Sequence, residues 1–313
     1  MNKIAHFIVY SKAAPYLAAL LYIVMWVSRA VPTGGVCISG CLGLLLMLVM
    51  GYLSVRVARE YLFSDGKNAL PATLLFMGCA IEPQVAPLHG NGMLFILFTI
   101  ACYVLLQTYR NRNAMGSYFL AFALVGALCL RLPSLWLVLP WLVLCGTFME
   151  SLHVRTFFAA LWGLLFPCWI VVGVLFVIDR VDLIVYYFEQ ELPSIAKVSE
   201  VLSSPLQWAQ LVWVLLLALP SSVMILLNHS MKLQASAGFR LLIASLVLLL
   251  IAIGLFPSCY SALSPCVLLC TSLVGATLFA GNTNRARNIY LFVLLILWLF
   301  LLGWQTWSNY QIY

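Results

Sequence analysis

Long apolar runs dominate the chain, and they alternate with short segments that hold most of its charges. Runs such as 241–256 and 289–303 lack the apolar–polar alternation that is typical of barrel strands. In hydrocarbon every backbone polar group needs an internal partner, so only helices or a closed barrel can cross a membrane. The pattern therefore predicts an all-α polytopic transmembrane helix bundle.

The apolar runs predict eleven spans, because a span needs about 20 predominantly apolar residues. They are 13–31, 36–55, 69–86, 92–109, 115–131, 134–149, 156–178, 206–228, 239–257, 264–281 and 288–308. The loops between them are too short for a separate soluble fold, so we expect residues 1–313 to form a single integral membrane domain.

The segment 117–149 decides the number of spans. As a single helix it would be about 50 Å long, against roughly 30 Å of hydrocarbon. It also contains Arg131, Pro133 and Pro140. A hairpin of two short helices, broken at 131–134, fits this length, whereas a single span would move every later loop to the other side of the membrane.

Composition and charge agree with this layout. Hydrophobic residues make up 65% of the chain and charged residues only 8%, whereas a soluble domain carries about 25%. With a cytoplasmic N-terminus, twelve of the sixteen Lys and Arg residues fall inside and four outside. This positive-inside bias favours an inside N-terminus and an outside C-terminus. The bases form no stripe of the kind that binds nucleic acid, so no nucleic-acid partner is expected.

The longest predicted outside segment, 179–205, carries five acids and two bases. Within it Ile195, Val198 and Leu202 recur at helical spacing, and Pro193 stands where a helix can begin. We expect a short amphipathic helix on the outer membrane surface. The alternative is a solvated loop with one helical turn.

Familiar catalytic motifs are missing from the sequence. It has no G-x-x-x-x-G-K-[ST], H-E-x-x-H or G-x-S-x-G pattern. The four histidines are far apart, and most of the ten cysteines lie inside apolar runs, where a free thiol behaves as a small hydrophobe. We therefore predict no metal site and no cofactor, and the motifs leave open whether the chain is an enzyme.

Three charges follow apolar runs that are too short to cross the hydrocarbon. Arg29, Glu82 and Arg131 follow runs of about 20 to 24 Å, against a core of roughly 30 Å. All three point toward the outer side in the predicted topology, and His89 follows on that side. We predict a recessed outward-facing cavity, lined by Arg29, Glu82, His89 and Arg131, that binds a substrate. Guanidinium groups match phosphate oxygens, so the expected ligand is a membrane lipid. The alternative is a structural ion pair that locks the bundle.

A central stretch, from TYRNRN at 108–113 to LLFPCWI at 164–170, has a two-span hairpin, a turn with Glu150 and Arg155, and a span closing in Leu-Phe-Pro. It resembles a family of bacterial inner-membrane proteins defined only as a domain of unknown function. The resemblance covers about residues 60–180. It implies a multi-pass protein of the bacterial inner (cytoplasmic) membrane, and it brings no activity, cofactor or catalytic residue.

A looser likeness is to envelope-glycan enzymes that use polyprenyl-phosphate sugars. The glycosyltransferases among them have an acid in the first outside loop, which here is Val31–Gly35 without a carboxylate. The polymerases usually have a larger outside loop than 179–205. These features lead to three hypotheses: a protein that handles a polyprenyl-linked or phospholipid substrate in cell-envelope biogenesis, a non-catalytic subunit or scaffold with membrane-protein partners, and a transporter.

Overall fold

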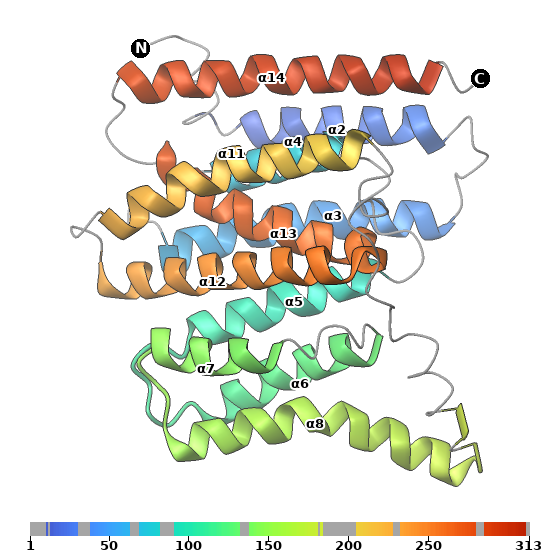
Figure 1. The fold of residues 1–313 in the computed structure, drawn as a ribbon, viewed down its shortest axis with the longest axis vertical. Helices are drawn as coiled ribbons and strands as arrows, with labels where there is room; N and C mark the ends of the chain where they lie inside the picture. The colour runs from blue at the N-terminus through green and yellow to red at the C-terminus, as the bar shows by residue number, and fades with distance from the viewer. Residues whose placement is uncertain are drawn as a thin grey trace. The chain divides into compact units, whose positions relative to one another are not determined.

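The computed structural model describes residues 11, 13–30, 38–62, 69–81, 91–131, 138–180, 182–183, 205–227, 232–279 and 285–310. These residues form eleven α-helices and short 3-10 and π-helical turns, with no strand among them (Figure 1). Each α-helix corresponds to one of the eleven predicted spans. The all-α class is therefore confirmed.

Five helices are long and apolar enough to cross a membrane. They are Val154–Val177, Pro205–Leu227, Leu233–Leu255, Tyr260–Leu278 and Arg285–Trp307. The chain is therefore a membrane protein, while the count of eleven spans and their orientation stay predictions. Most of the predicted outer loop, 181 and 184–204, lies outside the described residues, and so does its proposed amphipathic helix.

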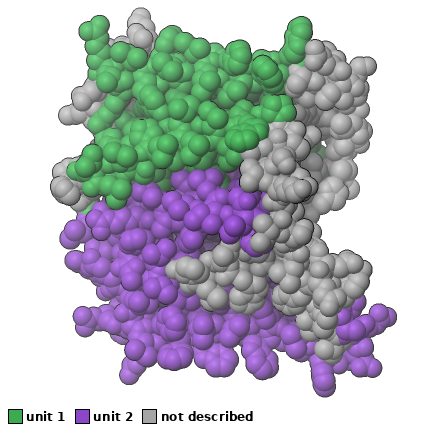
Figure 2. All heavy atoms as spheres, viewed as in Figure 1, with its two compact units in different colours: residues 1–92, 202–232, 267–313 green, residues 93–201, 233–266 purple. Residues whose placement is uncertain are grey.

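The chain divides into two compact units, which Figure 2 colours separately. Unit 1 comprises residues 1–92, 202–232 and 267–313, and unit 2 comprises 93–201 and 233–266. The long helix α13 (Tyr260–Gly275) passes from unit 2 to unit 1 at Val267.

Unit 1 is built around one short helix, α4 (Leu70–Ile81). Elements packed against it include α2 (Ala14–Ala30), α3 (Ile38–Val57), α11 (Pro205–Leu227), the 3-10 turn η5 (Ala276–Leu278) and α14 (Arg285–Tyr310), and the π-helical turn η1 (Ala58–Leu62) follows α3. Both α2 and α3 pack against α4 (Figure 1).

Unit 2 contains α5 from Met93 onward and five further elements. The elements are α5 (Asn91–Leu106), α6 (Met115–Arg131), α7 (Val138–Phe148), α8 (Val154–Val177), α12 (Leu233–Leu255) and the 3-10 turn η4 (Pro257–Cys259). Trp141 of α7 stacks on Phe98 and donates a hydrogen bond of 2.7 Å to Ser245 Oγ of α12. This contact ties α5, α7 and α12 together.

Two glycines bring the backbones of α6 and α8 into direct contact. A Cβ atom added at Gly126 would collide with the carbonyl oxygen of Leu164, and one added at Gly163 would collide with that of Phe119. Small residues are typical of helix interfaces in membranes, because close backbone approach maximises van der Waals contact where the hydrophobic effect gives no help.

The segment 117–149 holds two helices, α6 and α7. Arg110, before α6, forms an ion pair of 2.6 Å with Glu150, after α7, and its N–H donates to Met149 O at 3.0 Å. The start of α6 and the end of α7 therefore lie at the same end of unit 2. The hydrogen bond and the negative charge of Glu150 raise the pKa of Arg110 above its usual value, so the guanidinium stays protonated.

Candidate functional site at the buried end of α4

Local sequence explains where α4 begins and ends. Pro71 stands in its first turn, where the missing N–H costs nothing. Its last described residue is Ile81; the next residue in the sequence, Glu82, precedes Pro83, and a residue before proline is disfavoured in the α conformation. With twelve residues, α4 is about 18 Å long, well short of the roughly 30 Å of hydrocarbon.

All twelve residues of α4 are buried. Phe76 stacks on Tyr22 of α2, with ring centroids 6.1 Å apart. On its other side the ring occupies the place where a side chain at Gly51 of α3 would be. Gly78 is equally restricted, because a Cβ atom there would meet Leu268 and the indole of Trp213. The helix is therefore buried on every side.

Three side chains from other helices donate hydrogen bonds to carbonyl oxygens in the last turns of α4. From α14, Trp298 Nε1 donates to Met77 O at 2.9 Å. From α11, Gln210 Nε2 donates to Gly78 O at 3.4 Å. The amide of Gln305, with its nitrogen facing α4, lies 2.9 Å from Ala80 O and 3.2 Å from Ile81 O.

The two amides satisfy carbonyl groups that the helix itself leaves without partners, whereas Met77 O, the acceptor of Trp298, can also accept from the N–H of Ile81 within the helix. The last four carbonyls of an α-helix have no intrahelical donor, and together they carry a partial negative charge. A longer helix would not give the carbonyl of Cys79 an intrahelical donor, because the residue four positions later is Pro83, which has no N–H. Neutral amide and indole donors thus stabilise a helix end that is shielded from water.

A further polar group nearby has no described partner. The hydroxyl of Tyr22 is buried, and no hydrogen bond to it is found among the described residues. Leaving a buried donor unsatisfied costs about 1–3 kcal/mol. Together with Gln210 and Gln305, which are 2% and 0% exposed, it places several polar groups in the buried surroundings of α4.

The four predicted site residues are placed only in part. Arg29 lies in the last turn of α2 in unit 1, and Arg131 is the final residue of α6 in unit 2, but their side chains are outside what the structure describes. Glu82 and His89 lie outside the described residues altogether. Their meeting in one recess therefore stays a prediction.

Sequence reasoning missed Gln210, Gln305 and Trp298. A signal was present for the two glutamines, because each is an amide within a strongly apolar run. In a membrane such polar side chains face protein or water-filled space. Trp298 gave no such signal, since tryptophans are common at membrane boundaries.

The fold and this site define a helical membrane protein built around an enclosed short helix. Among the described residues no group of three or more His, Cys, Asp and Glu side chains is arranged to hold a metal ion. Comparison with protein-family models, curated proteins and solved structures found no match to this chain.

Proposed function

We propose that the chain is a multi-pass protein of the bacterial inner membrane that handles a phosphate-bearing lipid, either a polyprenyl-linked or a phospholipid substrate, from the outer face during cell-envelope biogenesis. The observation that carries the proposal is the buried, hydrogen-bonded end of α4, after which the chain continues with Glu82. The resemblance of residues 60–180 to a bacterial inner-membrane family supports the choice of membrane.

The depth of this helix end supports a recess. The described helix α4 covers only about 18 Å of the roughly 30 Å of hydrocarbon, so we expect its end at Ile81 to lie below the membrane surface. Irregular backbone at such depth is tolerated only inside protein or beside a water-filled cavity. A carboxylate at Glu82 would stand next to the negative end of the α4 dipole, so it would require a cation or water to remain ionised.

Arg29 is well placed to supply that cation. It follows Tyr22 by seven residues, or about 10.5 Å along α2, while α4 ends five residues, or about 7.5 Å, beyond Phe76. Tyr22 stacks on Phe76. In the predicted topology α2 and α4 are the first and third spans and so run in the same direction, and the two levels would then differ by about 3 Å. A guanidinium there can pair with Glu82 or hold a phosphate in its fork geometry. Arg131 and His89 complete the proposed recess.

Two other functions remain as candidates on specific observations. A non-catalytic subunit or scaffold is favoured by the well-satisfied carbonyls of α4, which are equally suited to a purely structural core. A transporter is favoured by α4 itself, because discontinuous helices with polar partners are typical of transporter binding sites.

Substitution of the two arginines tests the proposal. Arg29→Gln and Arg131→Gln should abolish function and leave expression intact, whereas Arg29→Lys, which keeps the charge, should retain part of the function. Arg180→Gln is the matched control, because Arg180 is an exposed arginine predicted on the same side. The readouts are the envelope glycans and lipids of the mutant cells and the phosphate-bearing lipids that remain bound to the purified protein. Unchanged glycan and lipid profiles in a variant that carries both Arg29→Gln and Arg131→Gln would contradict lipid handling.

The recess itself can be tested by chemical labelling. Cysteine introduced at positions 29, 82, 89 and 131 should react from outside with a small, membrane-impermeant thiol reagent, measured against the unsubstituted protein as background. Protection of all four positions would favour the structural ion pair and the scaffold function.

A further inference from the structure

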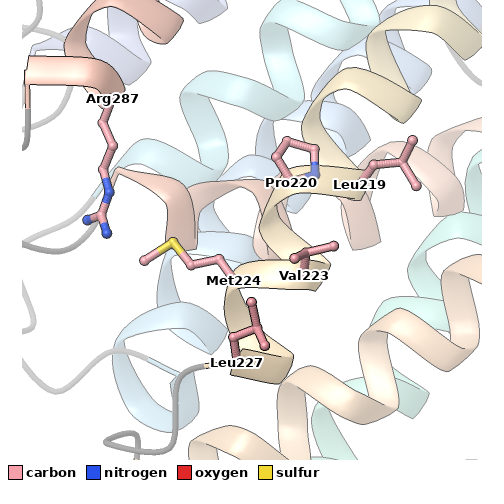
Figure 3. A pocket seen from close by; sticks show the side chains of 6 residues that line it. All are labelled: Leu219, Pro220, Val223, Met224, Leu227 and Arg287. Atoms are coloured by element: carbon pink, nitrogen blue, oxygen red, sulfur yellow. The ribbon is translucent and has the colours of Figure 1, made fainter.

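A groove runs along α11 in unit 1, away from the buried end of α4. It is lined by Leu219, Pro220, Val223, Met224 and Leu227 of α11 and by Arg287 of α14 (Figure 3). It is wide open to its surroundings, and its volume is about 910 Å³. Neither the proposed recess nor the contacts of α4 use these side chains.

A proline defines one end of the groove. Pro220 stands inside α11 and has no N–H, so the carbonyl of Leu216 loses its intrahelical partner. The hydroxyl of Tyr290 in α14 donates a hydrogen bond to that carbonyl instead. The bond fixes α14 against α11, and it lies one helical turn from Arg287, so the groove has a defined wall on the α14 side.

The floor of the groove suits a hydrocarbon chain. Leu219, Val223 and Leu227 are four residues apart, so they form one stripe along α11. They are 59%, 54% and 72% exposed, and the stripe extends for about 12 Å. Met224 extends from α11 toward the side of the groove where Arg287 lies (Figure 3). Its flexible thioether adapts to irregular apolar ligands.

The α14 side of the groove suits an anion. Arg287 is the third residue of α14, whose 26 residues give a length of about 39 Å, more than the roughly 30 Å of hydrocarbon. The first turn of α14 therefore reaches the level of the lipid headgroups. Arg285 in the same turn adds a second positive charge, and the positive end of the α14 dipole also favours a phosphate.

We propose that this groove binds an anionic phospholipid, with one acyl chain along Leu219, Val223 and Leu227 and the phosphate at Arg287. In the predicted orientation the lipid belongs to the cytoplasmic leaflet, where anionic headgroups and inward-facing basic residues meet. The site is separate from the recess proposed at the outer face.

Binding is tested by native mass spectrometry of the purified full-length protein, titrated with palmitoyl-oleoyl phosphatidylglycerol or with the zwitterionic phosphatidylcholine of the same chains. The unsubstituted protein should bind phosphatidylglycerol about tenfold more tightly. Arg287→Gln should remove that preference, whereas Arg112→Gln, which changes an exposed arginine in unit 2, should leave it unchanged.

Filling the groove tests the acyl-chain part. Val223→Trp should weaken the binding of both lipids, and Leu215→Trp should not, because Leu215 is a 45% exposed residue of the same helix that does not line the groove. Thermal unfolding of each variant confirms that it is folded, and Leu227→Trp replaces Val223→Trp if the latter fails to fold.

Three results would overturn the proposal: equal affinity for the two lipids, an unchanged preference in Arg287→Gln, or displacement of phosphatidylglycerol by millimolar inorganic phosphate alone. Arg29→Gln should retain the phosphatidylglycerol preference, so a failure at the recess and a failure at the groove are distinguishable.

Discussion

Individual buried polar side chains distinguish the core of unit 1 from an ordinary apolar helix bundle. Gln305 is fully buried, and its amide faces two carbonyls at the end of α4. In hydrocarbon no water is available to donate hydrogen bonds to those carbonyls. The amide therefore satisfies them, and it also fixes the rotation of α14 about its axis. Tyr22, by contrast, has a buried hydroxyl with no partner among the described residues, as expected of a group that a ligand or water could use.

Replacing Gln305 by Met should lower the free energy of unfolding by about 1–2 kcal/mol, because two buried carbonyls lose their donor while side-chain volume is preserved. The measurement is reversible unfolding in mixed micelles of SDS and a mild detergent. Thr306→Val is the control on the neighbouring residue, whose exposed hydroxyl bonds only to Gly303 O in its own helix. Equal stability of both variants would mean that the Gln305 contacts contribute nothing.

At the scale of the element, the closest packing lies between α6 and α8. Gly126 and Gly163 each face a backbone carbonyl of the opposite helix, so the contact is reciprocal and depends on the absence of a side chain. Other glycines of the same helices, Gly116 and Gly173, have open space where a Cβ atom would be. Glycine is therefore required at two of these four positions.

Gly126→Ala should destabilise the protein by about 1–3 kcal/mol, because the added methyl group forces α6 and α8 apart. Gly116→Ala should have no effect or a small stabilising one, since alanine favours the helix by up to about 1 kcal/mol. Both variants are compared in the same SDS unfolding assay. A Gly126→Ala protein as stable as Gly116→Ala would show that the two helices do not pack as described.

At the scale of the whole molecule, one ion pair bears on the topology. Arg110 and Glu150 are forty residues apart in sequence and are joined at 2.6 Å. Both side chains are about half exposed, so the pair adds little to stability. Its value is geometric: a single span between these residues would put them on opposite sides of the membrane, so their contact favours the predicted hairpin.

Reporter fusions test this layout. Alkaline phosphatase joined after Arg112 or after Arg155 should be inactive, and a fluorescent protein at the same positions should fluoresce, because both sites are expected in the cytoplasm. A fusion after Arg180 should give the opposite pair of results. Periplasmic activity after Arg155 would contradict both the hairpin and the outward direction of the proposed recess.

How far the sequence predicts the fold depends on the range of the interactions involved. Some helix ends followed from local features, as near Arg131 and Pro133, whereas the predicted span 69–86 extends past Ile81, the last described residue of α4. The enclosure of α4 did not follow, because the helix is apolar on all sides and no polar face indicates which neighbours it meets. The candidate recess was predicted from charges alone, and Gln305 was overlooked because its partners are more than two hundred residues away.

The sequence by itself determined that this chain is a helical membrane protein and where its helices lie, because in hydrocarbon each segment must satisfy its own backbone hydrogen bonds, and that is a local property. Only the tertiary structure decided that α4 is the enclosed centre of unit 1, that amides from α11 and α14 cap it, and that α11 and α14 form a groove ending at Arg287. Those features depend on the shapes of side chains from distant segments, which apolar sequence patterns do not distinguish.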